Sequence, residues 1–228
     1  MDQIFDTLGD YTALVVAFAL VVLLWTVVRH VVTIVHEGGH ALAALLTGRQ
    51  LVGIRLHSDT SGLTLSRGKP YGAGMVVTGA AGYLAPPLAA IFVAFLMAEG
   101  HLRFLGLVTL ACVAILLLVI RNVFGALLLV GAVIGLIWLD GHSTVDLQGQ
   151  LFFVLAWVLV LGNLRTISET TRSRTGRTDV DALYRLTRIP RGLWIAVLYT
   201  VTVGAAAIVW NLQELTIPEW LLTATAGT

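Results

Sequence analysis

The residues best suited to chemistry are five consecutive positions, His36-Glu37-Gly38-Gly39-His40, which form the pattern His-Glu-x-x-His. On an α-helix, positions i and i+4 lie on one face, so both imidazoles can reach a single metal ion. Glu37 lies between them and can take a proton from a water molecule bound to that metal. Zinc lowers the pKa of such a water to about 7, and it also polarises a peptide carbonyl. The pattern predicts a zinc site with peptidase chemistry, in which His36 and His40 are ligands and Glu37 is the general base.

The sequence that surrounds this motif is strongly apolar. Of the 228 residues, 57% are hydrophobic and 12% are charged, and the mean hydropathy is +0.90. A soluble domain has roughly 25% charged residues, so this chain lacks the surface that a water-soluble fold needs. The composition predicts a multi-pass protein of the cell membrane, with the lipid bilayer as its solvent. The net charge of +1 gives no reason to expect a nucleic acid partner.

Seven apolar stretches can be read along the chain, and most approach the roughly 20 residues that cross a bilayer. They are 11–28, 31–47, 71–98, 103–120, 123–139, 147–164 and 191–212. A straight helix over 11–47 would be about 55 Å long, which exceeds a hydrocarbon core of about 30 Å. We therefore expect a break at Arg29-His30, and another at Arg121-Asn122. The predicted fold is an all-α membrane protein with six to seven transmembrane helices, organised as one domain over 1–228.

The segment 48–70, directly after the motif, differs in kind from the apolar stretches. Its leucines and isoleucine alternate with small and polar residues, which is typical of strands. We predict two short strands, at about 51–57 and 62–67, joined by a turn rich in Ser, Asp, Thr and Gly. The fold is thus expected to carry one short β-hairpin after the HEGGH helix.

A second polar segment, 168–190, is basic. The arginines crowd in and around it, at Arg165, Arg172, Arg174, Arg177, Arg185, Arg188 and Arg191. Because basic loops between membrane spans stay in the cytoplasm, we expect 168–190 to be a cytoplasmic loop, and the hairpin segment 48–70 to lie on the same side. Within the loop, Thr178 followed by Asp181 predicts a capping box that opens a short helix.

The sequence resembles the site-2 protease clan of membrane zinc metallopeptidases. The resemblance rests on a His-Glu-x-x-His motif inside an apolar helix, a strand-forming segment after it, and Gly-rich apolar helices. Further segments resemble a bacterial branch of that clan: AAGYLAPP (80–87), RNVFG (121–125), AWVLVLGNLR (156–165) and TDVDALYRLTRIPRGLW (178–194). The likeness runs from Thr33 to about Trp210. Typical members carry Gly-Pro-x-x-Asn in the second core helix, where this chain has Gly82-Tyr83-Leu84-Ala85-Pro86, so their substrate handling does not carry over.

A catalytic zinc site has three protein ligands, and the resemblance implies two candidates for the third. Asp140 lies in a Leu-Asp-Gly sequence like that of typical clan members, but the expected topology puts it on the opposite side of the membrane from His40. Asp179 lies in Thr-Asp-Val, similar to the Ser-Asp-Ala of the bacterial branch, and on the same side as His40. We prefer Asp179. Asp179 could instead simply favour the first turn of a helix, and Asn122 is a remote third option.

These observations lead to a zinc-dependent membrane endopeptidase that hydrolyses peptide bonds in or near the transmembrane segments of a membrane protein or peptide. The predicted hairpin would offer an edge strand to an extended substrate. One alternative is a catalytically inactive membrane scaffold or regulator that retains a remnant of the metal site. A transporter is a third reading, for which the sequence shows no internal repeat.

Overall fold

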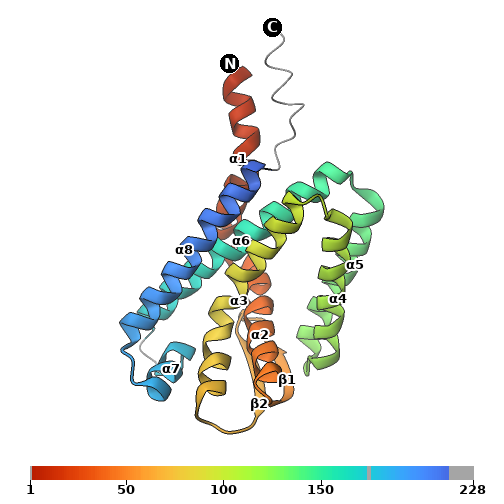
Figure 1. Cartoon of the computed structure of the whole chain (residues 1–228). Helices are drawn as coiled ribbons and strands as arrows, with labels where there is room; N and C mark the ends of the chain where they lie inside the picture. Colours follow the sequence, from red (N-terminus) through yellow and green to blue (C-terminus); the bar gives the residue numbers. More distant parts are fainter. Residues whose placement is uncertain (1, 174–175, 216–228) are drawn as a thin grey trace.

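The structure is a computed structural model, and it describes residues 2–173 and 176–215 (Figure 1). Arg174 of the basic loop lies outside these residues. Helices dominate the described part of the chain, and one antiparallel pair of strands is inserted after the second helix. The elements are α1 (Asp2–Leu23), α2 (Trp25–Leu46), β1 (Gln50–Leu56), β2 (Gly62–Arg67), α3 (Ala73–Ala98), α4 (Leu102–Val119), α5 (Val123–His142), α6 (Val145–Arg172), α7 (Asp179–Thr187) and α8 (Arg191–Leu215).

Five of the helices, α3, α4, α5, α6 and α8, are long and apolar enough to cross a membrane. The apolar part of α1 and the whole of α2 form a sixth candidate, bent by 107° at the break between them. The predicted all-α membrane fold with a short hairpin is therefore confirmed, with five to six candidate spans in the described residues. The protein is a multi-pass membrane protein by the length and composition of these helices.

The first break in the chain lies at Leu24, between α1 and α2, and not at the predicted position after Arg29. Arg29 continues α2 because its charge is paired with Glu169 of α6 at 3.2 Å. The indole N–H of Trp25 also donates to Glu169, at 2.8 Å, and the guanidinium of Arg165 lies over the Trp25 ring, 4.8 Å from its centroid. These contacts fix the start of α2 against α6, so the bend falls one residue before Trp25.

The core of the molecule is built by α3, which packs against α2, α6, α7 and α8. Close approach of α2 and α3 depends on Gly39, where an added Cβ would lie 2.5 Å from Ala85 Cβ and 2.6 Å from the Ala81 carbonyl oxygen. The α4–α5 pair stands to one side of this core, as Figure 1 shows. In the most apolar stretch of each helix, only 6% of α4 and 11% of α5 is buried inside the protein, which suits helices that face lipid.

The hairpin has one covered edge and one edge that no strand of the described residues pairs with. β1 and β2 pair with each other in antiparallel register from Gln50↔Arg67 to Leu56↔Gly62. The outer edge of β1 is covered by the α4–α5 junction, where Arg121 N–H donates to the Ile54 carbonyl at 2.8 Å. The Asn122 side chain also donates to the Leu56 carbonyl at 2.6 Å and accepts from its N–H at 3.1 Å. The predicted break at Arg121-Asn122 is confirmed, and its polar residues close the β1 edge.

Candidate metal centre

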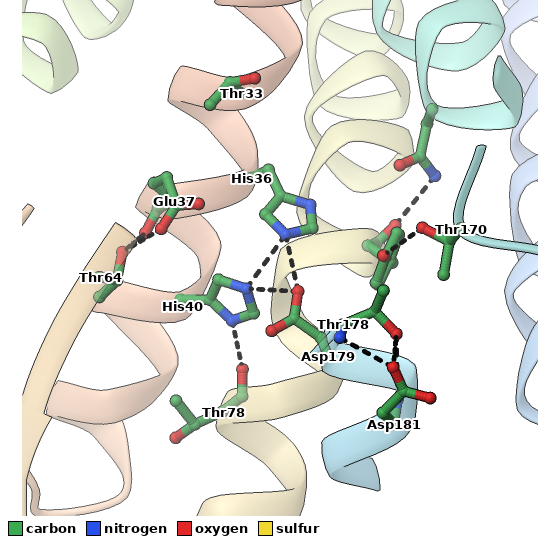
Figure 2. A network of polar contacts seen from close by, with 12 residues as sticks. Thr33, His36, Glu37, His40, Thr64, Thr78, Thr170, Thr178, Asp179 and Asp181 are labelled. Carbon is green, nitrogen blue, oxygen red and sulfur yellow. Dashed lines mark hydrogen bonds and ion pairs between the residues drawn. The ribbon is translucent and has the colours of Figure 1, made fainter. Parts of the chain in front are cut away.

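Two turns of α2 and the first residue of α7 bring three ligand-type side chains together (Figure 2). His36 Nε2 and His40 Nε2 are 3.1 Å apart. Asp179 Oδ2 lies 3.2 Å from His36 Nε2 and 3.4 Å from His40 Nε2. Zinc bound tetrahedrally at ligand distances near 2.0–2.1 Å would place its ligand atoms about 3.3 Å from one another. The donor types and their spacing therefore fit a zinc ion.

The two histidines are held differently. His40 Nδ1–H donates to the carbonyl of Thr78 on α3 at 2.6 Å, an assignment that follows because a carbonyl only accepts. Nε2 of His40 is thereby directed at the cluster, an arrangement common around metal ligands. His36 Nδ1 is buried without a hydrogen bond among the described residues, and the ring is held instead by the edge-on ring of Tyr83, 4.8 Å between centroids. Tyr83 is in turn fixed by a hydrogen bond to Thr170 at 2.8 Å.

Asp179 is directed at the imidazoles rather than at its own helix. Burial alone would raise the pKa of Asp179, but the contacts with His36 and His40 outweigh burial and hold the pKa well below the usual range of a carboxyl. The side chain is therefore an ionised carboxylate, which is the form that ligates a metal. The favourable position in the first turn of a helix, considered from the sequence, does not account for this orientation.

The start of α7 is fixed by the predicted capping box, which the structure confirms. Thr178 accepts from the Asp181 N–H at 3.2 Å, and the Asp181 carboxylate accepts from the Thr178 N–H at 2.9 Å. Arg191, the first residue of α8, forms an ion pair with Asp181 at 2.9 Å. Burial would raise the pKa of Asp181, but Thr178 and the positive charges of Arg191 and Arg185 lower it. This network sets the place from which Asp179 reaches the cluster.

Glu37 lies in the same cavity but is engaged with the hairpin. Its side chain is buried, and its Oε2 accepts a hydrogen bond from Thr64 Oγ1 of β2 at 2.6 Å. Figure 2 shows the carboxylate turned toward Thr64, beside the His36–His40–Asp179 cluster. Gly62 of the same strand lies against this carboxylate, because an added Cβ would be 2.6 Å from Glu37 Oε1.

A glycine of α3 leaves the space in which the ligand atoms meet. A Cβ added to Gly82 would overlap the Nε2 atoms of both His36 and His40. In the HEGGH motif itself, the two glycines differ: Gly39 is needed for the approach of α3, whereas a Cβ on Gly38 would make an ordinary contact of 3.9 Å with Leu116. Gly39, and not Gly38, is therefore the motif glycine whose small size lets α3 come close.

The other third-ligand candidates lie elsewhere. Asp140 is exposed near the end of α5, and the described residues place it outside the His36–His40–Asp179 cluster. Both polar atoms of the Asn122 amide are occupied by the backbone of Leu56. The structure thus brings Asp179, and neither Asp140 nor Asn122, to the two histidines.

Sequence reasoning missed three residues that shape this site: Thr64, Thr78 and Gly82. Thr78 acts through its backbone carbonyl, for which the side chain gives no signal. Thr64 belongs to no motif and meets Glu37 only through the packing of the hairpin on α2. Gly82 lay in a quoted segment, and its small size on a helix was the one available sign of a close approach.

A cavity of about 500 Å³ connects the cluster with the hairpin. Its walls come from α2, β2, α3, α6 and α7. The lining residues include His36, Glu37 and His40 on one wall, and the segment from Thr60 to Thr64 on another. A polypeptide lying in this cavity would contact the candidate ligands and the β2 strand together.

The fold and the site define a class: a multi-pass membrane protein in which a His-Glu-x-x-His helix and a carboxylate from a separate short helix form a candidate metal centre. The family model described as Peptidase M50B-like matches residues 11–209 of the chain. The chain belongs to this family, which is the site-2 protease family. No curated protein and no solved structure matches the chain.

Proposed function

We propose that this protein is a zinc-dependent membrane endopeptidase that hydrolyses peptide bonds in or near transmembrane segments. His36, His40 and Asp179 hold the zinc, and Glu37 is the general base. The observation that supports this most directly is the meeting of two imidazole nitrogens and one carboxylate oxygen at 3.1–3.4 Å from one another. Membership of a peptidase family supports the same conclusion.

The chemistry requires a proton to move twice. A bound zinc ion would supply an acidified water and a polarised substrate carbonyl. Glu37 follows His36 directly in α2 and lines the same cavity, so its carboxylate can accept one proton from the attacking water. Glu37 then returns that proton to the amine nitrogen as the C–N bond breaks, which leaves the residue ready for another cycle. Positioned acid–base catalysis of this kind contributes roughly 10²–10⁴-fold in rate.

The substrate must be extended, because the backbone of an intact helix is shielded by its own hydrogen bonds. β2 offers a free edge for such a segment, since β1 covers one side of it and the cavity lies on the other. In an antiparallel pair, alternate residues direct their N–H and C=O groups away from the partner strand. His57 N–H donates to the Ser61 carbonyl at 2.8 Å, so the alternation directs the backbone of Gly62, Thr64 and Ser66 outward. A membrane protein or peptide that unwinds near the site can pair with this edge.

The cavity is assigned to the cytoplasmic side of the cell membrane. The hairpin and α7 lie at the same end of the molecule, as Figure 1 shows, and both adjoin clusters of arginines. Basic segments beside membrane spans are retained in the cytoplasm. The peptide bonds within reach are therefore those near the cytoplasmic end of a substrate span.

Purified protein reconstituted with zinc and a set of single-span membrane peptides tests the proposal. Wild type should contain about one zinc per chain and cleave at least one peptide, with the products identified by mass spectrometry. Glu37→Gln should retain zinc and lose cleavage, by roughly 10²-fold or more. His40→Ala should lose both. Zinc-loaded wild type that cleaves no more than Glu37→Gln would reject the endopeptidase and favour a scaffold or regulator.

A further inference from the structure

We propose that Thr64 of β2 is a positioning residue for Glu37, so that the strand which offers its edge to the substrate also orients the general base. This inference rests on the proposed function. It assigns to the hairpin a part in the chemical step, in addition to a part in binding.

The contact between Thr64 and Glu37 is short and directed. Thr64 Oγ1 lies 2.6 Å from Glu37 Oε2 and 3.1 Å from the Glu37 backbone carbonyl oxygen. A hydroxyl has one hydrogen, which the geometry assigns to the closer carboxylate oxygen. Hydrogen bonds to an ionised carboxylate are shorter and roughly twice as strong as neutral ones. Because the Glu37 side chain is buried, a protein donor of this kind helps to fix the orientation of its carboxylate.

Gly62, on the same strand as Thr64, packs directly against the Glu37 carboxylate. A Cβ at this position would lie 2.5 Å from Glu37 Cγ and 2.6 Å from Oε1, so no larger residue fits while Glu37 keeps this place. One carboxylate oxygen is thus bound by Thr64, and the other lies against the hydrogen atoms of Gly62. The second oxygen has no hydroxyl donor from β2 and is the one free to take a proton from water.

The hairpin is also held in register along α2. One turn before Glu37, Thr33 Oγ1 donates to the carbonyl of Thr60 at 2.9 Å. The hairpin therefore meets α2 at two levels, with Thr60 of its turn beside Thr33 and Thr64 of β2 beside Glu37. A peptide paired with β2 would be placed along α2 by the same contacts. The hairpin would thus set both the position of the peptide and the position of the Glu37 carboxylate.

The two functions of Thr64 can be separated because they use different atoms. Its backbone N–H and C=O face the free edge, whereas its side chain faces Glu37. Thr64→Val removes the hydroxyl, keeps the shape of the side chain and leaves the backbone edge intact. We expect kcat to fall 10- to 100-fold, the size typical of lost supporting contacts at a metal site. KM and zinc content should stay at wild-type values, and Thr64→Ser, which restores the hydroxyl, should recover most of kcat.

The experiment measures kcat, KM and bound zinc for wild type, Thr64→Val, Thr64→Ser and a control, Thr200→Val. The control removes a hydroxyl that donates to the carbonyl of Ala196 in its own helix. Active wild type with unchanged kcat in Thr64→Val would overturn the inference and leave the proposed function standing. Loss of zinc in Thr64→Val, or equal loss of kcat in Thr64→Ser, would also overturn it, since a structural role would then explain the result. Inactive, zinc-loaded wild type would reject the proposed function together with this inference.

Discussion

His36 Nε2 and Asp179 Oδ2 lie 3.2 Å apart although 143 positions separate the two residues in the chain. His36 is carried by α2 and Asp179 by α7, and α3 packs against both helices. The candidate site is therefore a product of tertiary packing around α3. Substitutions that disturb that packing should weaken metal binding as strongly as substitutions of the ligands.

The identity of the third ligand can be tested with two matched substitutions. Asp179→Ala removes a carboxylate that lies within 3.4 Å of both imidazoles, so bound zinc should fall well below one per chain. Asp140→Ala removes an exposed carboxylate of α5 and should leave zinc content unchanged. Elemental analysis of the purified proteins measures both. Zinc retained in Asp179→Ala and lost in Asp140→Ala would reverse the assignment.

Gly82 should be as necessary for metal binding as a ligand, because its missing side chain leaves the space between the imidazole nitrogens. Gly82→Ala places a methyl group onto His36 Nε2 and His40 Nε2, and we expect loss of zinc from a protein that still inserts into membranes. Gly106→Ala is the matched control, since nothing lies within 4 Å of its Cβ position. If Gly82→Ala binds zinc as tightly as wild type, the described approach of α3 to the histidines is wrong.

Short-range patterns in the sequence predicted much of this architecture. The spacing of His36 and His40 indicated one helical face, and the Thr178–Asp181 pair indicated the start of α7. Alternation predicted the hairpin to within a residue or two of its observed ends. Each of these signals lies within a few turns of helix or one strand pair, where sequence neighbours are also spatial neighbours. Zinc binding and catalysis by the assembled residues stay predictions.

The features that the sequence did not reveal all depend on distant partners. A break was predicted at Arg29-His30 because one straight helix over 11–47 would be too long for a bilayer and these are its polar residues. Arg29 is instead paired with Glu169 of α6, and the bend lies at Leu24. Thr64 likewise meets Glu37 only once the hairpin folds back on α2. A single sequence does not indicate which distant polar residues will be in contact, so these pairings could not be predicted from it.

The stability of the α7 region should depend on pH through Asp181. Because its pKa is lowered in the folded protein, its ionised form stabilises the fold above the ordinary carboxyl pKa of 3.8, and this contribution is lost as the pH falls through the lower, folded-state pKa. Asp181→Asn should melt lower than wild type at neutral pH, and the difference should shrink on acidification. A cap of this kind contributes about 1 kcal/mol, or roughly 2–4 °C for a chain of this size. Thermal unfolding in detergent at several pH values measures this.

Arg191→Gln provides the partner test for the same network. It removes the cation that lies 2.9 Å from the Asp181 carboxylate. Like Asp181→Asn, it should therefore lower the melting temperature at neutral pH, and by less at acidic pH. If the difference in melting temperature between Asp181→Asn and wild type stayed constant from neutral to acidic pH, the ionised carboxylate would have no stabilising role.

The free edge of β2 can be tested at Ser66, whose backbone N–H is expected to face the cavity. Ser66→Pro removes that N–H and should slow cleavage chiefly by raising KM, because a paired substrate loses one main-chain hydrogen bond. Ser66→Ala keeps the N–H and loses only the side-chain contact from Arg49, so it should cleave faster than Ser66→Pro. Prolines at Gly62 are unsuitable, since any side chain there meets Glu37. Equal KM values for the two Ser66 variants would argue against edge pairing.

The distance along the chain between His36 and Asp179 also sets an order of events during synthesis. A ribosome that has made α2 has already completed the whole HEGGH motif, yet the third donor emerges only after α3, α4, α5 and α6. Truncated products that stop before α7 carry the recognisable motif without the full donor set. The proposed hydrolytic site is thus complete only once α7 has been made, when α8 is the one candidate span of the described residues still to be synthesised.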